Sequence, residues 1–466
     1  MGDEERSRQS GAPPTESVAA TVDAPATVDA PAADVTDEQY VVIGGPERKA
    51  ERTNVVVMKF GGSSVADANC IKRVANIIVE ARKAGHPVVA VVSARGDTTD
   101  ELIEMAKEIS ADPPAREMDM LLSTGERISA ALLAMAIHDL GYDAISLTGS
   151  QAGIVTDTVH TKAKILDIKP GRIRKALDEN KIVLVAGFQG VSTTQDVTTL
   201  GRGGSDTTAV ALAAALGAEV CEIYTDVEGV FTTDPRVVPE ARKLDTISNE
   251  ELLELAASGA KVMMARGVEV ARRFDVPLHI RSSFTSAPGT WIGQDDPSME
   301  QAIVSGVTYA LDDAKVTIHD LPDKVGVAAK IFTTLANAHV NLDVIIQNVS
   351  AGGTTDISFT ASEDDLPKIS RILGELQGEL GFTSFDTDKE VAKVTLVGAG
   401  MKTYPGVAAK MFEVLAENGI NIEMISTSTI KISCVIRKQH VETAVKALHA
   451  AFRLHKGMVS REEVFG

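Results

Sequence analysis

Two glycine-rich stretches, far apart in the sequence, carry charged residues of a kind that handles phosphate. The first, Lys59-Phe60-Gly61-Gly62-Ser63-Ser64, places a lysine before two glycines and two hydroxyl groups. The second, Gly201-Arg202-Gly203-Gly204-Ser205-Asp206, holds a cation and a carboxylate in one loop. Glycine lets backbone amides approach a ligand, and a helix that begins at such a loop offers unpaired N–H groups and a positive dipole end. The two stretches therefore indicate anion binding.

Each stretch also has an interpretation that involves no chemistry. Lys59 could be a solvated lysine at the end of a strand, and Ser205 or Asp206 could simply cap a helix. Neither stretch has the spacing of a P-loop or of a dinucleotide-binding fingerprint. A site is favoured because there are two such loops, each between a predicted strand and a predicted helix.

The elements that must position these loops alternate between strand and helix. Apolar patterning predicts strands at 54–59, 87–93, 144–147, 182–186 and 219–224, and helices at 100–109, 127–141 and 209–216. Continuous apolar strands between helices indicate an α/β fold with a mostly parallel sheet, sandwiched by helices. In such sheets functional groups collect in loops after the carboxyl ends of the strands. The candidates expected in those loops are Ser93, Thr98, Glu126, the Arg202 loop, Thr225 and Asp226. Glu126 could instead only complement the first turn of a helix.

Composition limits the classes of protein to consider. The chain has 466 residues, room for about three domains. A net charge of −19 argues against nucleic acid and anionic membranes as partners. We find no apolar run near 18 residues and predict no transmembrane span. Three scattered cysteines fit no metal spacing and indicate reduced thiols in a cytoplasmic protein.

Residues 1–52 differ from the rest of the chain. Residues 20–25 (ATVDAP) are repeated at once as 26–31, and residues 1–50 hold ten acidic against four basic side chains, a net −6. Such a segment cannot bury enough apolar surface to fold. We predict a disordered acidic tail.

The last third of the chain contains an internal repeat. Gly326–Ile345 and Gly406–Ile425 are identical at ten of twenty positions, and similar elements surround both copies. The expected order is close to β-α-β-β-α-β, the ferredoxin-like pattern. The Ser/Gly/Pro-rich segment Ser282–Gln301 before it is predicted to be a linker or a domain edge.

Several of these motifs, in one order, resemble the signatures of the aspartate kinases (aspartokinases), which belong to the amino-acid kinase family. They are Lys59–Val65, Ser123–Glu126, Gly201–Asp206, Tyr224–Asp226 and Thr232–Arg236. The resemblance covers about residues 54–460, and the repeat resembles a tandem pair of ACT domains. It implies a catalytic domain at 53–300, a first ACT domain at 301–390 and a second at 391–466.

The resemblance implies transfer of the γ-phosphoryl group of ATP to the side-chain carboxylate of L-aspartate, giving 4-phospho-L-aspartate. This is the first step toward lysine, threonine, methionine and isoleucine. That carboxylate is ionised near pH 7, so no general base is needed, and the protein must align two anions and neutralise charge. Lys59 and Asp206 are the implied catalytic residues. The implied substrate contacts are Ser93, Thr98, Glu126, Arg202, Gly203, Gly204 and Ser205.

The resemblance also implies the nucleotide contacts Lys59, Phe60, Gly61, Gly62, Ser63, Thr225, Asp226, Phe231, Arg236 and Lys261. Phe231 stands where many relatives have Tyr, so a hydroxyl contact is lost. Mg²⁺ is the implied counter-ion, and since it leans on phosphates and water, no protein ligand is assigned.

For regulation, the resemblance implies feedback inhibition by threonine, lysine or both, and a homo- or hetero-oligomer joined through the ACT domains. The implied effector contacts are Asp323, Asn341, Leu342, Asp343, Gln347, Asn421, Ile422, Ser428 and Thr429. Asn341 could instead only cap a turn. Thr429 stands where many inhibited relatives have Glu, which removes a partner for a lysine ammonium group.

Two other functions stay open. One is another kinase of the amino-acid kinase fold, which the Glu126 and Arg202 motifs and the ACT pair disfavour. The other is a catalytically inactive amino-acid sensor, which the retention of Lys59, Arg202 and Asp206 disfavours.

Overall fold

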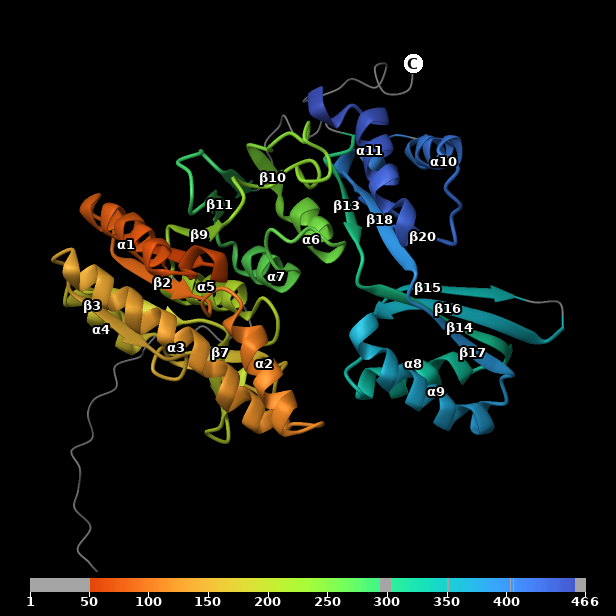
Figure 1. Cartoon of the computed structure of the whole chain (residues 1–466), viewed down its shortest axis with the longest axis horizontal. Coiled ribbons are helices and arrows are strands. Elements are labelled where there is room, and N and C mark those ends of the chain that lie inside the picture. The colour runs from red at the N-terminus through yellow and green to blue at the C-terminus, as the bar shows by residue number, and fades with distance from the viewer. Residues whose placement is uncertain (1–50, 294–302, 350–351, 403, 405, 457–466) are drawn as a thin grey trace, which may run out of the picture. The chain divides into compact units, whose positions relative to one another are not determined.

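A computed structural model describes residues 51–293, 303–349, 352–402, 404 and 406–456. The predicted tail lies outside these residues, except Glu51 and Arg52. The largest element is an eight-stranded sheet (Figure 1). Its strands, in spatial order, are β10 (Thr246–Ser248), β12 (Thr290–Gly293), β11 (Leu278–Ser282), β9 (Val220–Thr225), β1 (Val56–Phe60), β2 (Val88–Val92), β6 (Ile182–Ala186) and β3 (Ala144–Leu147). The β11–β12 pair is antiparallel and the other paired neighbours are parallel. The predicted α/β class is confirmed.

Both faces of this sheet are buried, as its continuous apolar strands predict. Alternate residues of β2 face opposite layers: Val89 and Val91 join a core with α5, while Val88, Ala90 and Val92 join a core with α1 and α3. The helices of this domain are α1 (Ala68–Lys83), α2 (Thr98–Ile109), α3 (Ala115–Asp139), α4 (Gly171–Asp178), α5 (Gly204–Leu216), α6 (Asn249–Ala257) and α7 (Ala265–Phe274).

Two of the predicted helix starts are wrong. The helix predicted at 209–216 begins at Gly204, and the one predicted at 127–141 begins at Ala115. In both cases Gly, Ser and Thr near the start have low helix propensity, which suggested a loop. Packing overrides propensity, because every residue of α5 is buried. Asp206 and Glu126 therefore lie inside helices, and Ser205 and Asp206 do not cap α5, whose N-cap residue is Gly203.

Two further features depart from the predictions. Part of the predicted linker Ser282–Gln301 is β12, a strand of the main sheet, and residues 294–301 lie outside the described residues. A second, four-stranded sheet was not predicted at all. Its strands are β5 (Ile165–Ile168), β4 (Ile154–Thr156), β7 (Gln189–Ser192) and β8 (Val197–Thr199).

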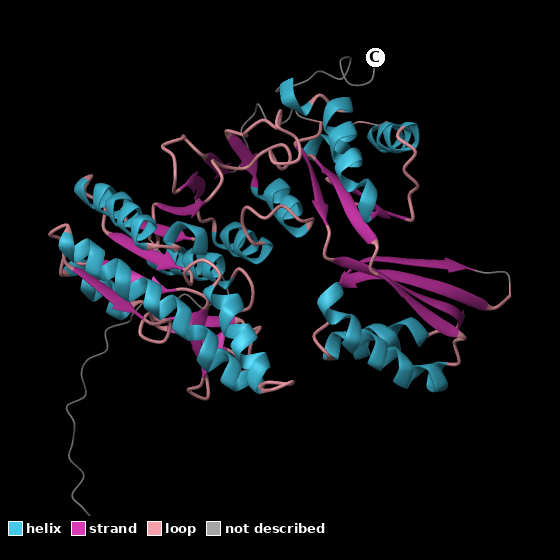
Figure 2. Ribbon diagram, viewed as in Figure 1, coloured by secondary structure: helices cyan, strands magenta, loops and turns pink. Residues whose placement is uncertain are grey.

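The first copy of the repeat folds as the sequence predicts. Its elements are β14 (Asp313–Pro322), α8 (Val327–Asn337), β15 (Leu342–Val349), β16 (Thr354–Ser362), α9 (Leu366–Leu380) and β17 (Ser384–Asp388). The sheet order is β15-β16-β14-β17, and the two helices pack on one face of it (Figure 2).

The second copy completes its sheet in another way. It contains β18 (Val391–Val397), α10 (Val407–Glu417), β19 (Met424–Thr427), β20 (Lys431–Arg437) and α11 (Val441–Ala451), and its sheet order is β13-β18-β20-β19. The edge strand β13 (Gly306–Ala310) comes from the chain before the first copy and pairs antiparallel with β18. It lies inside the range 301–390 expected for the first ACT domain, yet it is a strand of the sheet in the second copy of the repeat.

By length and composition alone, one helix among the described residues, α3, could cross a membrane. Half of its most apolar window is buried inside the fold, and it carries the buried carboxylates of Asp119 and Glu126. These properties are typical of a core helix in a folded domain.

Candidate active site

The two glycine-rich stretches meet at the carboxyl ends of the parallel strands of the main sheet. Lys59 lies near the carboxyl end of β1, and Asp206 lies in the first turn of α5. Lys59 Nζ is 2.6 Å from Asp206 Oδ1, and the two side chains are 13% and 6% exposed. Asp206 Oδ2 also accepts a hydrogen bond from the Met264 backbone N–H at 3.0 Å. An ion pair so far removed from water is held in one geometry, with its charges poorly screened.

Backbone conformation shapes the second loop for this arrangement. Gly203 has φ of 70°, in the left-handed region that favours glycine, and a Cβ there would lie 1.7 Å from the Met264 side chain. Thr208 Oγ1 donates to Gly204 O and accepts from Phe188 N–H, which ties the helix start to the end of β6. The first turn of α5, with its positive dipole end, is therefore held at the carboxyl edge of the strands.

Glu126 reaches the same edge from the middle of α3. It was expected in a loop, but Gly125 lies within the helix, where a Cβ would come 2.8 Å from Ala94 Cβ. This close approach lets Glu126 Oε1 accept the Ala94 N–H at 3.1 Å, while Oε2 is buried with no hydrogen-bond partner. Burial raises the pKa of Glu126 to about 7, although the N–H groups of Glu126 and Ala94 oppose the shift. A buried, half-satisfied carboxylate is suited to receive a cationic group of a ligand.

Ser93 directly precedes Ala94, and Thr98 lies close to Gly125. Ser93 follows β2, and its N–H donates to Phe60 O at 3.0 Å. Thr98 is the first residue of α2, and a Cβ on Gly125 would lie 3.7 Å from its methyl group. Arg202 is exposed at the tip of the second glycine loop.

The predicted nucleotide residues divide into two groups. Thr225 is the last residue of β9, and Asp226 follows it next to the first glycine loop, whose Gly61 N–H donates to Tyr224 O at 3.3 Å. Arg236 and Lys261 are 78% and 82% exposed and pair with other carboxylates, Asp234 at 2.8 Å and Asp312 at 3.8 Å. Among these contacts, none ties Arg236 or Lys261 to the Lys59–Asp206 pair.

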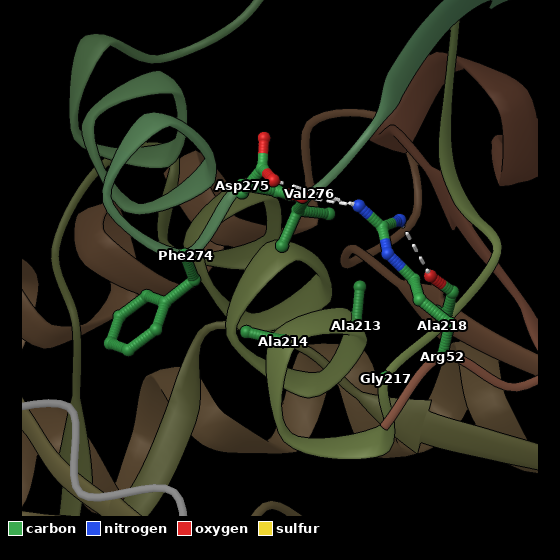
Figure 3. Close-up of a pocket in the computed structure, with 8 residues that line it drawn as sticks. All are labelled: Arg52, Ala213, Ala214, Gly217, Ala218, Phe274, Asp275 and Val276. Carbon is green, nitrogen blue, oxygen red and sulfur yellow. Dashed lines mark hydrogen bonds and ion pairs between the residues drawn. The ribbon is translucent and has the colours of Figure 1, made fainter. Parts of the chain in front are cut away.

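A cavity in the described part of the chain lies elsewhere (Figure 3). It has a volume of about 130 Å³ and is lined by Arg52, Ala213, Ala214, Gly217, Ala218, Phe274, Asp275 and Val276. Arg52 donates to the carbonyl oxygens of Ala218 and Asp275 across it. It sits at the C-terminal end of α5, whose last residues are roughly 10–15 Å along the helix from Asp206. The cavity is therefore no part of this site.

Comparison with known proteins matches this architecture. The amino acid kinase family matches residues 54–282, and the ACT domain matches residues 316–378 and 394–452. An aspartokinase of Mycolicibacterium smegmatis is 58% identical over 405 residues, which are 86% of this chain and 96% of that protein. The chain belongs to the aspartokinase family. It is a kinase that transfers a phosphoryl group from ATP to aspartate.

Solved aspartokinases share the fold. Aspartokinase III of E. coli in complex with aspartate and ADP (R-state) aligns with a TM-score of 0.74 at 26% identity, over 85% of this chain and 99% of that one. The same E. coli enzyme in complex with lysine and aspartate (T-state) aligns with a TM-score of 0.65 at 26% identity, over 86% and 100%.

The candidate site is also flanked by bonded residues that the sequence analysis did not name. Arg266 donates to the carbonyl oxygens of Leu200 and Ala163, which fixes the backbone that leads into the second glycine loop. The fully buried Asp119 accepts from the Thr199 hydroxyl at 2.5 Å and lies 2.6 Å from His160 Nδ1. No local pattern in the sequence marks these residues, because their partners are distant in the chain.

Proposed function

We propose that the Lys59–Asp206 pair is the centre at which this aspartokinase transfers the γ-phosphoryl group. The observation that carries the proposal is the 2.6 Å contact between side chains from two distant glycine loops. Lys59 would neutralise charge that spreads over the phosphoryl oxygens, and Asp206 would hold the ammonium group in place. The amides of Gly61 and Gly62 would cradle the ATP phosphates, with Phe60 and Ser63 beside them.

L-Aspartate would bind between α3 and the second glycine loop. The unpartnered Glu126 Oε2 is suited to the substrate ammonium group, and the exposed Arg202 fork to a carboxylate. Ser93 and Thr98 would donate hydroxyl hydrogen bonds to the substrate. Gly203, Gly204 and Ser205 would bring backbone amides close to it.

The adenine nucleotide would extend from the first glycine loop past Thr225 and Asp226 toward Phe231, Arg236 and Lys261. Among the described residues there is no cluster of three His, Cys, Asp or Glu side chains that could hold a metal ion. Mg²⁺ would be held mainly by nucleotide phosphates and water, as is common in kinases. When bound, Mg²⁺ would neutralise phosphate charge, and we assign it no protein ligand.

The ACT domains would bind threonine, lysine or both. The effector residues named from the sequence lie at or near the edge strand of each copy: Asn341, Leu342, Asp343 and Gln347 in or next to β15, with Asp323 before α8, and Asn421, Ile422, Ser428 and Thr429 on either side of β19. Asp343 is paired with the buried Lys393, so an effector amine there would compete with this lysine. An effector shifts the enzyme between states by its difference in affinity for them.

An oligomer would form through the ACT sheets. Ile345 on β15 and Ile425 on β19 are 49% and 42% exposed, occupy equivalent positions of the repeat, and lie on edge strands. Exposed apolar side chains on sheet edges favour pairing with another chain.

The three buried cysteines, which form no disulfide, support a cytoplasmic location.

The test is ATP-dependent formation of a hydroxamate, because hydroxylamine traps an acyl phosphate. We expect product with L-aspartate and little with glutamate or N-acetylglutamate. Lys59→Ala should lower kcat about a thousandfold, since it removes a preorganised charge at the transferred group. Lys72→Ala, which removes an exposed lysine from α1, is the matched control and should not change turnover.

Three outcomes would contradict parts of the proposal. Full activity of Lys59→Ala would remove Lys59 from the centre. Preference for another carboxylate would favour a different kinase of the same fold. Binding of threonine or lysine with no hydroxamate from any substrate would favour an inactive sensor.

A further inference from the structure

The segment that carries Phe231 and Arg236 is bound directly to the second ACT domain. Thr232, between them in sequence, is 1% exposed. Its carbonyl oxygen accepts the Val307 N–H of β13 at 2.8 Å. Its hydroxyl oxygen lies 2.9 Å from Nε2 of His449, on α11. One residue of the proposed nucleotide segment therefore contacts two elements of the regulatory domain.

The surrounding groups are compatible with a Thr232–His449 bond in which the hydroxyl donates to a neutral imidazole. Thr232 Oγ1 accepts the Arg242 N–H at 3.0 Å, so its own hydrogen is available to a neutral imidazole. His449 is 2% exposed, and burial, together with the nearby His455, lowers its pKa to about 4. The imidazole is thus neutral at physiological pH, and its Nε2 can accept the threonine hydroxyl.

Apolar packing joins the same two parts. Val238, which follows Arg236 by two residues, is buried in the core of the second ACT domain among the side chains of α10 and α11. The Tyr309 hydroxyl of β13 donates to Asp234, the carboxylate that holds Arg236. The position of the 231–236 segment is therefore set as much by the ACT domain as by the catalytic domain.

We infer that His449 is a positioning residue for ATP, which acts through Thr232 to hold the 231–236 segment in its nucleotide-binding conformation. The second ACT domain is, on this inference, a structural part of the nucleotide site. The inference rests on the proposed nucleotide role of Phe231 and Arg236.

The experiment measures KM for ATP, KM for aspartate and kcat of the full chain. His449→Ala should raise KM for ATP about tenfold, because it unpairs a buried hydroxyl, and leave KM for aspartate and kcat within about twofold. Thr232→Val, which removes the partner hydroxyl in the catalytic domain, should have the same effect. His449→Gln should keep KM for ATP within about threefold of the value for the unsubstituted chain, since the glutamine amide oxygen can accept the same hydrogen bond. His440→Ala removes another histidine of the same domain and should change nothing.

A merely structural role would raise both KM values or lower kcat in proportion to lost folded protein, and that result overturns the inference. An unchanged KM for ATP in Thr232→Val overturns it even if His449→Ala fails to fold. Arg236→Ala separates the two proposals. If it raises KM for ATP while the Thr232 and His449 variants do not, only the positioning role is wrong. If none of them changes KM for ATP, the nucleotide assignment is wrong as well.

Discussion

The two ACT domains are copies in sequence but differ in how they are built into the chain. In the first, the four strands of the sheet come from one continuous stretch, 313–388. In the second, the place that β17 occupies in the first sheet is taken by β13, from before the first copy. The first domain is thus inserted between two parts of the second.

The two ACT domains also differ in the part of the chain that they contact. The second domain shares buried hydrogen bonds with the catalytic domain: Thr232 with His449, and Glu251 with both Ser305 and the Ala399 N–H. The first domain is joined to the second by ion pairs, Lys315 with Glu423 and Lys393 with Asp343, and by an apolar cluster in which Val344 packs with residues of β18, β19 and β20. The second domain is therefore the one suited to transmit a change to the catalytic domain.

Matched core truncations should show the largest effect. Leu373 on α9 and Leu448 on α11 are both fully buried at equivalent positions. Leu373→Ala and Leu448→Ala should each lower the free energy of unfolding by about 4 kcal/mol. Only Leu448→Ala, beside His449, should also raise KM for ATP. Thermal unfolding and initial rates at a temperature where both variants are folded measure the two effects, and an equal rise in KM for both would abolish the contrast.

Removing the buried carboxylate of Glu251 should have an intermediate effect. Glu251 is 3% exposed, completes a capping box with Ser248, and accepts from Ser305 Oγ at 2.5 Å and Ala399 N–H at 3.0 Å. Glu251→Ala should cost about 2 kcal/mol of stability, because it leaves buried donors unpaired. The comparison is Glu363→Ala, which breaks only the half-exposed pair with Lys438 between the ACT domains and should cost under about 1 kcal/mol. Denaturant unfolding measures both, and equal losses would show that the two junctions are alike.

The smallest expected effect is on the pH dependence of stability, to which His449 and His319 should contribute with opposite signs. Burial and the nearby His455 lower the pKa of His449 to about 4, although the charge of Glu240 acts to raise it. Its stabilising contribution is present above pH 6.5 and lost as pH falls toward 4, since the unfolded chain takes up the proton first. Partial burial lowers the pKa of His319, but Asp356 and Asp386 raise it further, for a net rise. Its contribution is present below pH 6.5 and lost as pH rises through the folded value.

The melting temperature, measured at pH 5.5 and 7.5, tests this. On acidification it should fall less in His449→Gln than in the parent chain, and more in His319→Gln. The same sign of change in both variants would contradict the assigned environments.

Much of the site could be predicted because its residues are local in sequence. Lys59 and Asp206 each lie in a short strand–glycine–helix motif, and parallel strands bring the ends of such motifs to one edge. The Ser123–Glu126 motif was found as well, but Glu126 was expected in a loop and lies in α3, directly after Gly125. Its role is a close approach to Ala94, and the partner of a close approach is not visible in the local sequence.

The residue pattern by itself determined the α/β class, the two glycine loops and the repeat, since each depends on periodicity or on short stretches of sequence, and several short motifs carried the aspartokinase resemblance. Only the tertiary structure decided that Lys59 pairs with Asp206, that Glu126 is buried with one oxygen unpaired, and that β13 completes the second ACT sheet. It alone placed His449 against Thr232, 217 residues away in the chain. Such pairings depend on which buried groups satisfy one another once the whole chain has packed, and no local preference encodes that choice.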